Sequence, residues 1–261
     1  MEKIKIFTCY HKQEKKIENN IIKPLQVGAS ITDIDLGFLK DNTGDNISNK
    51  NATFCELTAL YWMWKNYSHL NYLGLFHYRR QMILKNQEAF KGDQWGLVPF
   101  TIVNYSLDAV GLDEEHLTQS ISEYDIILPE RWDVRLGGFI NMYQQYEASN
   151  HHFIEHLDIA IKIIEKKYPE FTESMYKSLV STNCLFTNIF IMKYELLDDY
   201  CNWLFPILFE VEANVDSSNY STQEKRYIGF LSERLFNIYF NWLVERKKYL
   251  KVKYAKRSFL R

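Results

Sequence analysis

The stretch "YLGLFHYRRQM", residues 72–82, joins a short apolar run to a cluster of polar and cationic side chains. Residues 72–76 have the length and composition of a buried strand. In an α/β protein, ligands bind beyond the carboxyl ends of parallel strands. The stretch therefore predicts a strand whose polar end, 77–80, faces a binding site. A strand that stops at a solvated loop would show the same pattern.

Runs of the same kind alternate with helical patterns along the rest of the chain. The polar segment 41–51, "DNTGDNISNKN", is dense in Asn, Asp, Gly and Ser and indicates a loop. The alternation predicts an α/β domain with a mostly parallel sheet flanked by helices, and a helical C-terminal part. The predicted strands are 4–9, 72–78, 124–130 and 185–193, and the predicted helices are 52–66, 151–167, 196–208 and 223–245.

The composition is that of an ordinary globular domain. Of the 261 residues, 46% are hydrophobic and 25% are charged, which is enough apolar material to bury a large core. Aromatic residues reach 16%, a value that indicates either aromatic packing or stacking on rings and sugars. We expect one domain over residues 1–245.

The C-terminal segment 246–261, "RKKYLKVKYAKRSFLR", contains eight basic residues and no acidic one. Without it the chain has 23 basic and 33 acidic residues, a net charge of −10. The segment is predicted to be a basic tail that either rests on an anionic membrane surface or is simply solvated. Because the body is acidic and would repel a phosphate backbone, nucleic acid is not an expected partner.

The cysteines and the N-terminal sequence indicate an intracellular protein. Four cysteines show no Cys-x-x-Cys pair and no metal-binding spacing with histidine, and they are expected to be reduced thiols: Cys9, Cys55, Cys184 and Cys201. The start "MEKIKIFTCYHK" lacks the apolar core of a signal peptide, and no run is long enough to span a bilayer. We expect a cytoplasmic protein that is either soluble or peripheral on the inner face of the cell membrane.

Familiar catalytic signatures are absent from the sequence. It contains no P-loop, no Gly-x-Gly-x-x-Gly, no Gly-x-Ser-x-Gly and no His-Glu-x-x-His. His151 and His152 each have a spacing from His156 that permits metal binding on a helix. No third ligand accompanies such a pair. The adjacent arginines Arg79 and Arg80 are more informative, because a guanidinium binds phosphate through two hydrogen bonds. An internal arginine–carboxylate network is the alternative reading.

Several segments together resemble a known family. They are "DNTGDNISNKNATFCELTALYWMWKN", "YLGLFHYRR", "TNIFIMK", "YCNWLFPILFEVE" and "RYIGFLSERLFNIYF". This set is similar to bacterial proteins long catalogued as a domain of unknown function and described as capsular-polysaccharide or lipopolysaccharide glycosyltransferases. The resemblance implies a domain of the GT-A type that uses a UDP-sugar donor and a glycan or lipid-linked glycan acceptor. Galactofuranosyl transfer is one activity associated with the group, and galactose is a second candidate sugar.

The chain departs from the usual GT-A pattern at one position. Most such enzymes end the strand corresponding to 72–77 with an Asp-x-Asp motif that holds Mn²⁺ or Mg²⁺ on the diphosphate. Here the strand ends in "HYRR", without an acidic residue. Metal dependence is therefore an open question, and two fixed cations are predicted to neutralise the departing diphosphate in place of a metal.

The resemblance and the polar strand ends together predict a donor site. Uracil and ribose are expected near the end of the first strand, and the diphosphate is expected near the end of 72–77. Short polar side chains in the loop 41–51 either bind sugar hydroxyls or serve turns and helix caps. The predicted donor-binding residues are Thr8, Tyr10, His11, Lys12, Gln26, Gly28, Asp45, Asn46, Asn49, His77, Tyr78, Arg79, Arg80 and Asn188.

An inverting transfer also needs a base for the acceptor hydroxyl. Asp45, Asp158, Glu224 and Glu233 are the candidates, although Glu233 and the adjacent Arg234 also fit a helix ion pair. His152 and Trp132 are predicted to contact the acceptor. Two other classes remain possible: a noncatalytic carbohydrate-binding or scaffold protein, and a phosphotransferase or nucleotidyltransferase acting on sugar phosphates. The latter would need metal-binding acids near the phosphates, and none is well placed.

Overall fold

A mixed β-sheet forms the centre of the computed structural model, which describes residues 3–261. Within these residues, the sheet has the strand order β3-β2-β1-β4-β10-β7-β11-β5, and β6 pairs with β11 beside this path. In chain order the strands are β1 (Ile4–Tyr10), β2 (Ile22–Gln26), β3 (Leu39–Lys40), β4 (Tyr72–His77), β5 (Met82–Ile83), β6 (Leu97–Phe100), β7 (Ile126–Pro129), β10 (Phe190–Lys193) and β11 (Val252–Leu260).

The first half of the sheet is parallel. β2 and β4 lie on either side of β1 and run in the same direction, and β3 extends the sheet beyond β2. β10 then runs antiparallel to both β4 and β7, and β11 is parallel to β7. A Cβ atom on Gly74 would lie only 2.9 Å from Ile6 and 3.1 Å from Ile191, so the centre of the sheet requires glycine there. The predicted α/β architecture with a mostly parallel sheet is confirmed.

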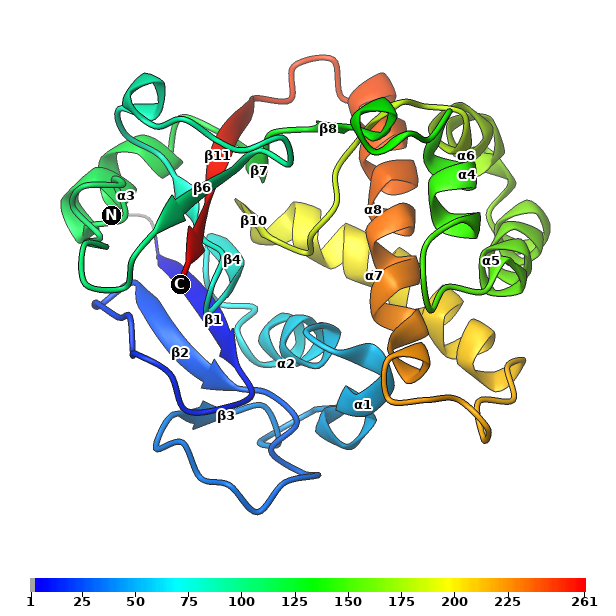
Figure 1. Ribbon diagram of the computed structural model, residues 1–261, viewed down its shortest axis with the longest axis horizontal. Helices are drawn as coiled ribbons and strands as arrows, with labels where there is room; N and C mark the ends of the chain where they lie inside the picture. Colours follow the sequence, from blue (N-terminus) through cyan, green and yellow to red (C-terminus); the bar gives the residue numbers. More distant parts are fainter. Residues whose placement is uncertain (1–2) are drawn as a thin grey trace.

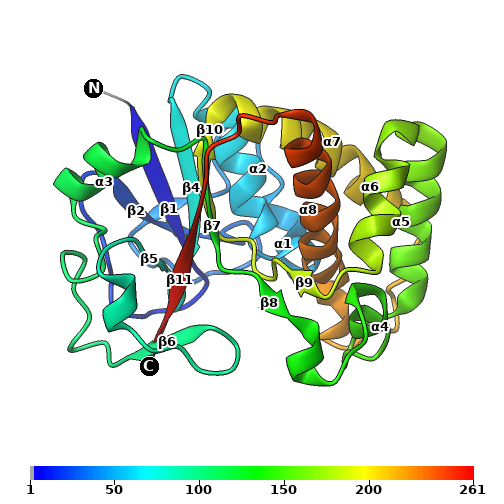
Figure 2. The same cartoon turned by 90° about the horizontal axis from the view of Figure 1, so that it is seen from above.

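Helices cover the sheet unequally, as Figures 1 and 2 show. Most of them gather on one side, where they form a large core with Phe7 and Cys9 of β1. α3 and the neighbouring loops cover the other face, where Ile4 and Ile6 of the same strand are buried. None of the described helices is long and apolar enough to cross a membrane. The helices are α1 (Asn51–Phe54), α2 (Leu57–Asn66), α3 (Glu114–Ile121), α4 (Met142–Glu147), α5 (Ile154–Lys167), α6 (Thr172–Leu179), α7 (Tyr194–Ala213) and α8 (Tyr227–Arg246).

A small two-stranded sheet and a shortened strand lie near the helical side. β8 (Trp132–Asp133) pairs with β9 (Asn183–Cys184), apart from the main sheet. The strand predicted over 185–193 is shorter than expected, because only Phe190–Lys193 forms β10. The preceding residues form a loop, and this loop carries Asn188.

The polar segment 41–51 is a loop as far as residue 47 and then a 3-10 turn (Ser48–Lys50) that leads into α1, and one buried carboxylate organises it. Asp41 accepts hydrogen bonds from the backbone N–H of Gly28 at 2.9 Å and of Ala29 at 3.1 Å. It also accepts from the hydroxyls of Ser48 and Thr58. Gly28 has a φ of 67°, a conformation that glycine adopts without strain. Asp41 and Gly28 therefore fix the loop against β2 instead of facing a ligand.

The segment predicted to be a basic tail is an internal part of the sheet. Residues 252–260 form β11, which pairs with β5, β6 and β7. Ala255 and Ser258 are fully buried, and Arg257 is only 8% exposed. Lys253 and Lys256 are partly exposed and bond backbone carbonyls, whereas Arg257 is buried, so the basic composition of the segment does not reveal its buried residues. The expectation of a separate tail over 246–261 is wrong for these residues, and the basic loop 247–251, between α8 and β11, remains on the surface.

The position of β11 predicts that substitutions at two neighbouring residues change the free energy of unfolding by very different amounts. Ala255→Asp places a carboxylate in the core and is expected to lower the free energy of unfolding by roughly 3–5 kcal/mol, because the buried charge has no partner. Tyr254→Asp alters a side chain that is 40% exposed and should cost roughly 1 kcal/mol or less. Urea unfolding followed by circular dichroism measures both. Equal effects of the two substitutions would contradict the assignment of this segment as a buried strand.

Candidate functional site

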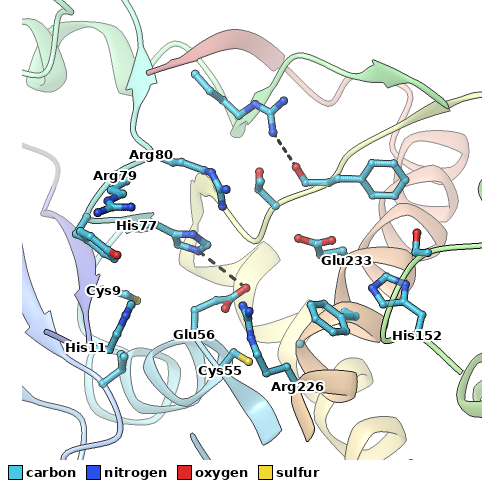
Figure 3. A pocket seen from close by; sticks show the side chains of 18 of the residues that line it. Cys9, His11, Cys55, Glu56, His77, Arg79, Arg80, His152, Arg226 and Glu233 are labelled. Carbon is cyan, nitrogen blue, oxygen red and sulfur yellow. Dashed lines mark hydrogen bonds and ion pairs between the residues drawn. The ribbon is translucent and has the colours of Figure 1, made fainter. Parts of the chain in front are cut away.

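A cavity of about 1210 Å³ opens where β1 and β4 end. Cys9 of β1 lies beside His77 of β4 in the parallel register, so the two strand ends reach the cavity together, as predicted. The opposite wall comes from α8 and the residues before it, and further sides come from the junction of α1 and α2 and from β11. Figure 3 shows these side chains converging on one space.

The turn after β4 separates the two predicted arginines. The backbone N–H of Arg80 donates to His77 O at 2.9 Å, and the N–H of His77 donates to Arg80 O at 3.1 Å. Arg79 then pairs with Glu14 at 3.2 Å on the outer side. In the part of the chain that the structure describes, the half-buried guanidinium of Arg80 has no carboxylate partner and lies 5.8 Å from the ring of Phe259. Arg80 is thus the free cation of the pair.

Positive side chains outnumber negative ones around the cavity. The acidic residues among the lining are Glu56 and Glu233. Six cationic side chains lie around the same space: Arg79, Arg80, Lys225, Arg226, Arg234 and Arg257. A nucleoside diphosphate or another concentrated anion is the kind of ligand that such an excess favours.

Two of these arginines serve the structure. Arg257 donates to Phe186 O at 2.9 Å and to Trp95 O at 2.7 Å. Arg234 donates to Phe230 O at 3.0 Å, to Glu233 and to Gln145. Burial, followed by the neighbouring Arg80, lowers the pKa of Arg257, and burial likewise lowers that of Arg234. Their positive charge is fixed in place and contributes to the field in the cavity.

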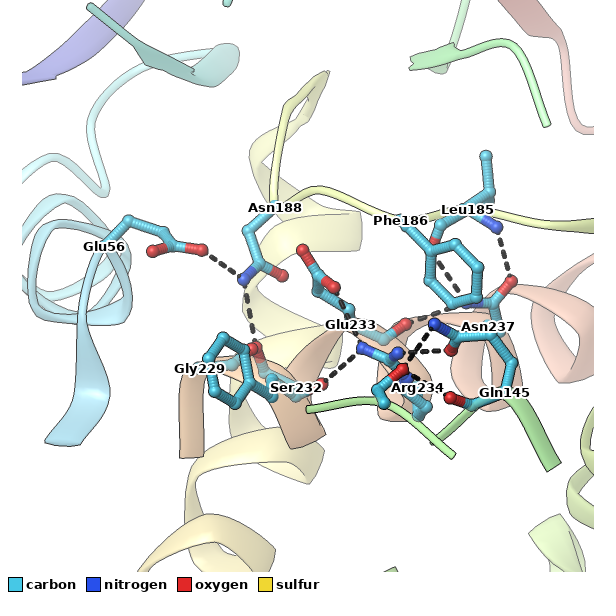
Figure 4. A network of polar contacts seen from close by, with 12 residues as sticks. Glu56, Gln145, Leu185, Phe186, Asn188, Gly229, Ser232, Glu233, Arg234 and Asn237 are labelled. Carbon is cyan, nitrogen blue, oxygen red and sulfur yellow. Dashed lines mark hydrogen bonds and ion pairs between the residues drawn. The ribbon is translucent and has the colours of Figure 1, made fainter. Parts of the chain in front are cut away.

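The two carboxylates are held differently. Glu233, on α8, has a side chain that is 22% exposed and lies 3.0 Å from Arg234, so the ion pair foreseen from the sequence is present. Burial raises the pKa of Glu233, and this rise exceeds the lowering effect of Arg234. Glu56 accepts a hydrogen bond from Asn188 Nδ2 at 2.6 Å and lies 3.9 Å from His77 Nε2. Figure 4 shows Glu56, Asn188 and Ser232 joined in one network.

The histidines at the cavity are kept neutral. The ring of His152 lies 4.6 Å from that of Tyr146 and 4.4 Å from that of Phe230. Burial and then the nearby Arg234 lower the pKa of His152 to about 3. Burial also lowers the pKa of His77, against the opposing effect of Glu56. Both rings can therefore donate or accept hydrogen bonds at neutral pH without adding charge.

The donor set at the strand end does not suit a divalent metal ion. Mg²⁺ and Mn²⁺ prefer oxygen ligands, chiefly carboxylates, whereas this turn presents Tyr78, Arg79 and Arg80. His156, one of three clustered histidines in the sequence, instead bonds the hydroxyl of Tyr220 at 2.9 Å. Across residues 3–261, no three His, Cys, Asp or Glu side chains converge as a metal site.

Eight of the predicted site residues line the cavity. They are His11, His77, Tyr78, Arg79, Arg80, Trp132, His152 and Glu233. Asn188 does not line it but holds Glu56, which does.

The predictions near the first strand require correction. Thr8 and Tyr10 are fully buried, and the Tyr10 hydroxyl bonds the backbone at Lys15 and Ile17, so its ring cannot stack on a base. Gln26 is 2% exposed and holds the backbone of Ile34 and Leu36. These side chains belong to the core because β1 and β2 are covered on both faces.

Other predicted residues lie outside the cavity. Lys12 forms an ion pair with Glu14 at 3.1 Å. Asn46 bonds Gly44 O and Ser48 N within its own turn, and Asp45 and Asn49 are exposed on the same loop. Asp158, on α5, accepts from the Tyr143 hydroxyl at 3.2 Å. Turn chemistry and surface contacts explain these side chains.

Sequence reasoning missed several residues that the fold brings to the cavity. Glu56 lies inside a segment that reads as one continuous helix, and Arg226 precedes another helix without a motif of its own. Trp95 lies in the segment 81–123, whose mixed sequence predicts no clear helix or strand, and Arg257 lies in the segment predicted to be a basic tail. The break between α1 and α2 at Cys55, which brings Glu56 to the cavity, has no signal in the sequence.

Comparisons with known proteins identify the family of the chain and a similar solved structure. A family model described as a domain of unknown function (DUF4422) matches residues 5–246. The chain is also similar to a solved structure titled WbbM bifunctional glycosyltransferase, apo structure, with 39% sequence identity and a TM-score of 0.94. The match covers 99% of this chain and 45% of that one, so the chain spans less than half of the solved protein. No curated protein sequence matches it.

The environment of His152 predicts an acid-sensitive fold. Unfolded histidine has a pKa near 6.5, whereas the folded value is about 3, so the unfolded state binds more protons as the pH falls below 6.5. The free energy of unfolding should therefore decrease on acidification. His152→Phe should reduce that decrease by roughly 1 kcal/mol between pH 7 and 5.5. Urea unfolding at the two pH values measures it, with His69→Phe at an exposed site as the control. An unchanged pH dependence in His152→Phe would contradict the prediction.

Proposed function

The chain belongs to the family described as a domain of unknown function (DUF4422), and we propose that it is a glycosyltransferase that uses a nucleoside-diphosphate sugar. The free guanidinium of Arg80, at the shared ends of two parallel strands in a cation-rich cavity, is the observation that carries the proposal. Arginine binds phosphate oxygens through two parallel hydrogen bonds and keeps its charge. The similarity to a structure titled a bifunctional glycosyltransferase supports the same activity.

The proposed reaction is displacement at the anomeric carbon of the donor sugar. An acceptor hydroxyl oxygen forms the new bond to that carbon, while the bond from the carbon to the diphosphate oxygen breaks. The bonding electrons leave with the diphosphate, whose negative charge is stabilised by contact with Arg80, while Lys225 and Arg226 add positive charge to the same cavity. Glu233 takes the proton from the acceptor hydroxyl. No metal ion is needed for these steps.

The finer assignment follows the family resemblance. We propose UDP as the nucleotide and galactofuranose or galactose as the transferred sugar, and a growing capsule, lipopolysaccharide or other surface glycan as the acceptor. Trp132 and His152 line the part of the cavity opposite β1 and are proposed to contact that acceptor. The basic loop 247–251 is the surface that we propose for association with the inner face of the membrane, since β11 is buried in the sheet.

The different environments of the two arginines give a test of donor binding. Arg80→Ala removes the free cation and should lower turnover by roughly 10²–10³, because its contact with the leaving diphosphate strengthens in the transition state. Arg79→Ala, whose side chain is already paired with Glu14, should lower turnover by roughly tenfold or less. Arg80→Lys should restore activity only in part, since it lacks the two-pronged geometry. Sugar transfer is measured with and without EDTA, and circular dichroism checks folding.

Three results would argue against this assignment. Near-normal turnover in folded Arg80→Ala would show that Arg80 does not stabilise the leaving diphosphate. Complete loss of wild-type sugar transfer in EDTA would show that a metal ion, and not the arginines, stabilises the charge of the diphosphate. Binding of glycan without any binding of UDP would favour a noncatalytic carbohydrate-binding protein.

The proposed base gives a second test. Burial raises the pKa of Glu233 above its ordinary value of 4.5, so the carboxylate becomes protonated, and activity falls, as the pH drops through that raised value. Glu233→Gln should reduce turnover by roughly 10²–10⁴ and abolish this acidic limb, while UDP still binds. Asp45→Asn and Asp158→Asn, at the other predicted bases, lie outside the cavity and should retain turnover. A comparable loss of turnover in either control variant would show that Glu233 is not the base.

A further inference from the structure

Two residues with unusual backbone conformations lie at the cavity. Among the described residues other than glycine, those with positive φ are Cys55 (51°), Asn86 (52°), His151 (64°) and Thr187 (121°). Cys55 and Thr187 both line the cavity. Such conformations are unfavourable for residues with a Cβ atom, most of all for a β-branched one, and they persist where the surrounding structure enforces them.

Each of these residues directly precedes one member of a hydrogen-bonded pair. Cys55 precedes Glu56, at the break between α1 and α2, and Thr187 precedes Asn188, in the loop before β10. Asn188 Nδ2 donates to Glu56 Oε1 at 2.6 Å and to Ser232 Oγ on α8 at 3.0 Å. Ser232 in turn donates to Gly229 O at 2.7 Å. Three segments far apart in the sequence therefore fix the position of one carboxylate (Figure 4).

The fixed carboxylate keeps hydrogen-bonding capacity for a ligand. An ionised carboxylate has two oxygens that together accept about four hydrogen bonds. In the described structure Oε1 of Glu56 accepts from Asn188, and Oε2 has no hydrogen-bond partner. Glu56 lines the cavity, and Figure 3 shows its carboxylate between His77, Arg226 and Glu233. A side chain fixed this firmly with one free oxygen is suited to recognise a hydrogen-bond donor.

The charge of Glu56 limits what that donor can be. A phosphate group carries only acceptors at neutral pH and is repelled by a carboxylate, so the diphosphate belongs with Arg80 on the other side of His77. A sugar hydroxyl can donate to the carboxylate in a short, charge-assisted hydrogen bond. Resting on the glycosyltransferase function proposed above, we propose that Glu56 recognises a hydroxyl group of the donor sugar and that Asn188 is its positioning residue.

Binding measurements separate this role from the others that Glu56 could have. Isothermal titration compares UDP with UDP-galactose and UDP-galactofuranose, using whichever sugar nucleotide the wild-type protein binds more tightly. Glu56→Gln replaces one oxygen with an amide group and should weaken binding of that sugar nucleotide by roughly 10- to 100-fold, with UDP affinity changed by less than about threefold. Asn188→Ala should show the same selective loss to a smaller degree. Glu18→Gln, which removes an exposed carboxylate outside the cavity, should change neither affinity.

The other outcomes overturn the proposal in distinct ways. If Glu56→Gln binds both nucleotides normally but loses turnover, Glu56 acts as a base and does not recognise the sugar. If it binds both nucleotides equally weakly, Glu56 supports the diphosphate site through His77. If Glu56→Gln keeps wild-type binding and turnover, it has no role in the reaction. Wild-type protein that binds none of the three nucleotides would instead refute the proposed function itself.

Discussion

The fold has to accommodate an excess of positive charge around one cavity. Six cationic side chains and two carboxylates surround a single space, and two of the arginines are buried. Buried charges are tolerated only when they are paired or hydrogen-bonded. Arg257 meets this requirement through two backbone carbonyls, and Arg234 meets it through Glu233, Gln145 and a carbonyl. The fold thus holds a positive field in place without neutralising it.

The chain path explains how these charges come together. β1 and β4 end side by side and bring His11 and the turn 77–80 to one edge of the sheet. β10 runs antiparallel to both β4 and β7, so β7 and the parallel β11 run in the same direction as β4. β11 therefore carries Arg257 and Phe259 to the same cavity. α8 supplies Glu233 and Arg234 from the helical side. The cavity therefore takes part of its lining from β1, the first strand, and part from β11, the last strand among the described residues.

The sequence was informative where a feature is local, and it was misleading where a feature depends on distant partners. The strand 72–77 and its polar end were predictable, because an apolar run followed by "HYRR" is continuous in the chain. The contact between Asn188 and Glu56 joins residues 132 positions apart, and nothing near either residue signals the other. The segment 246–261 has the composition of a basic tail, because half of its residues are Lys or Arg, and the buried residues of β11 become evident only beside β5, β6 and β7. Tyr10 follows the predicted first strand and Gln26 was expected near its end, yet both are buried by neighbouring loops.

The positive charge of the cavity couples binding of the diphosphate to the proton affinity of the proposed base, Glu233. Arg80 and Arg257 both lower the pKa of Glu233, although burial outweighs them. When a diphosphate binds to Arg80, its negative charge offsets that positive field, and the proton affinity of Glu233 must rise. The proposed base is then more basic with the donor bound than without it. A cavity whose arginines were all neutralised by its own carboxylates would lack this coupling, and for that reason the unpaired Arg80 matters to the base as well as to the leaving group.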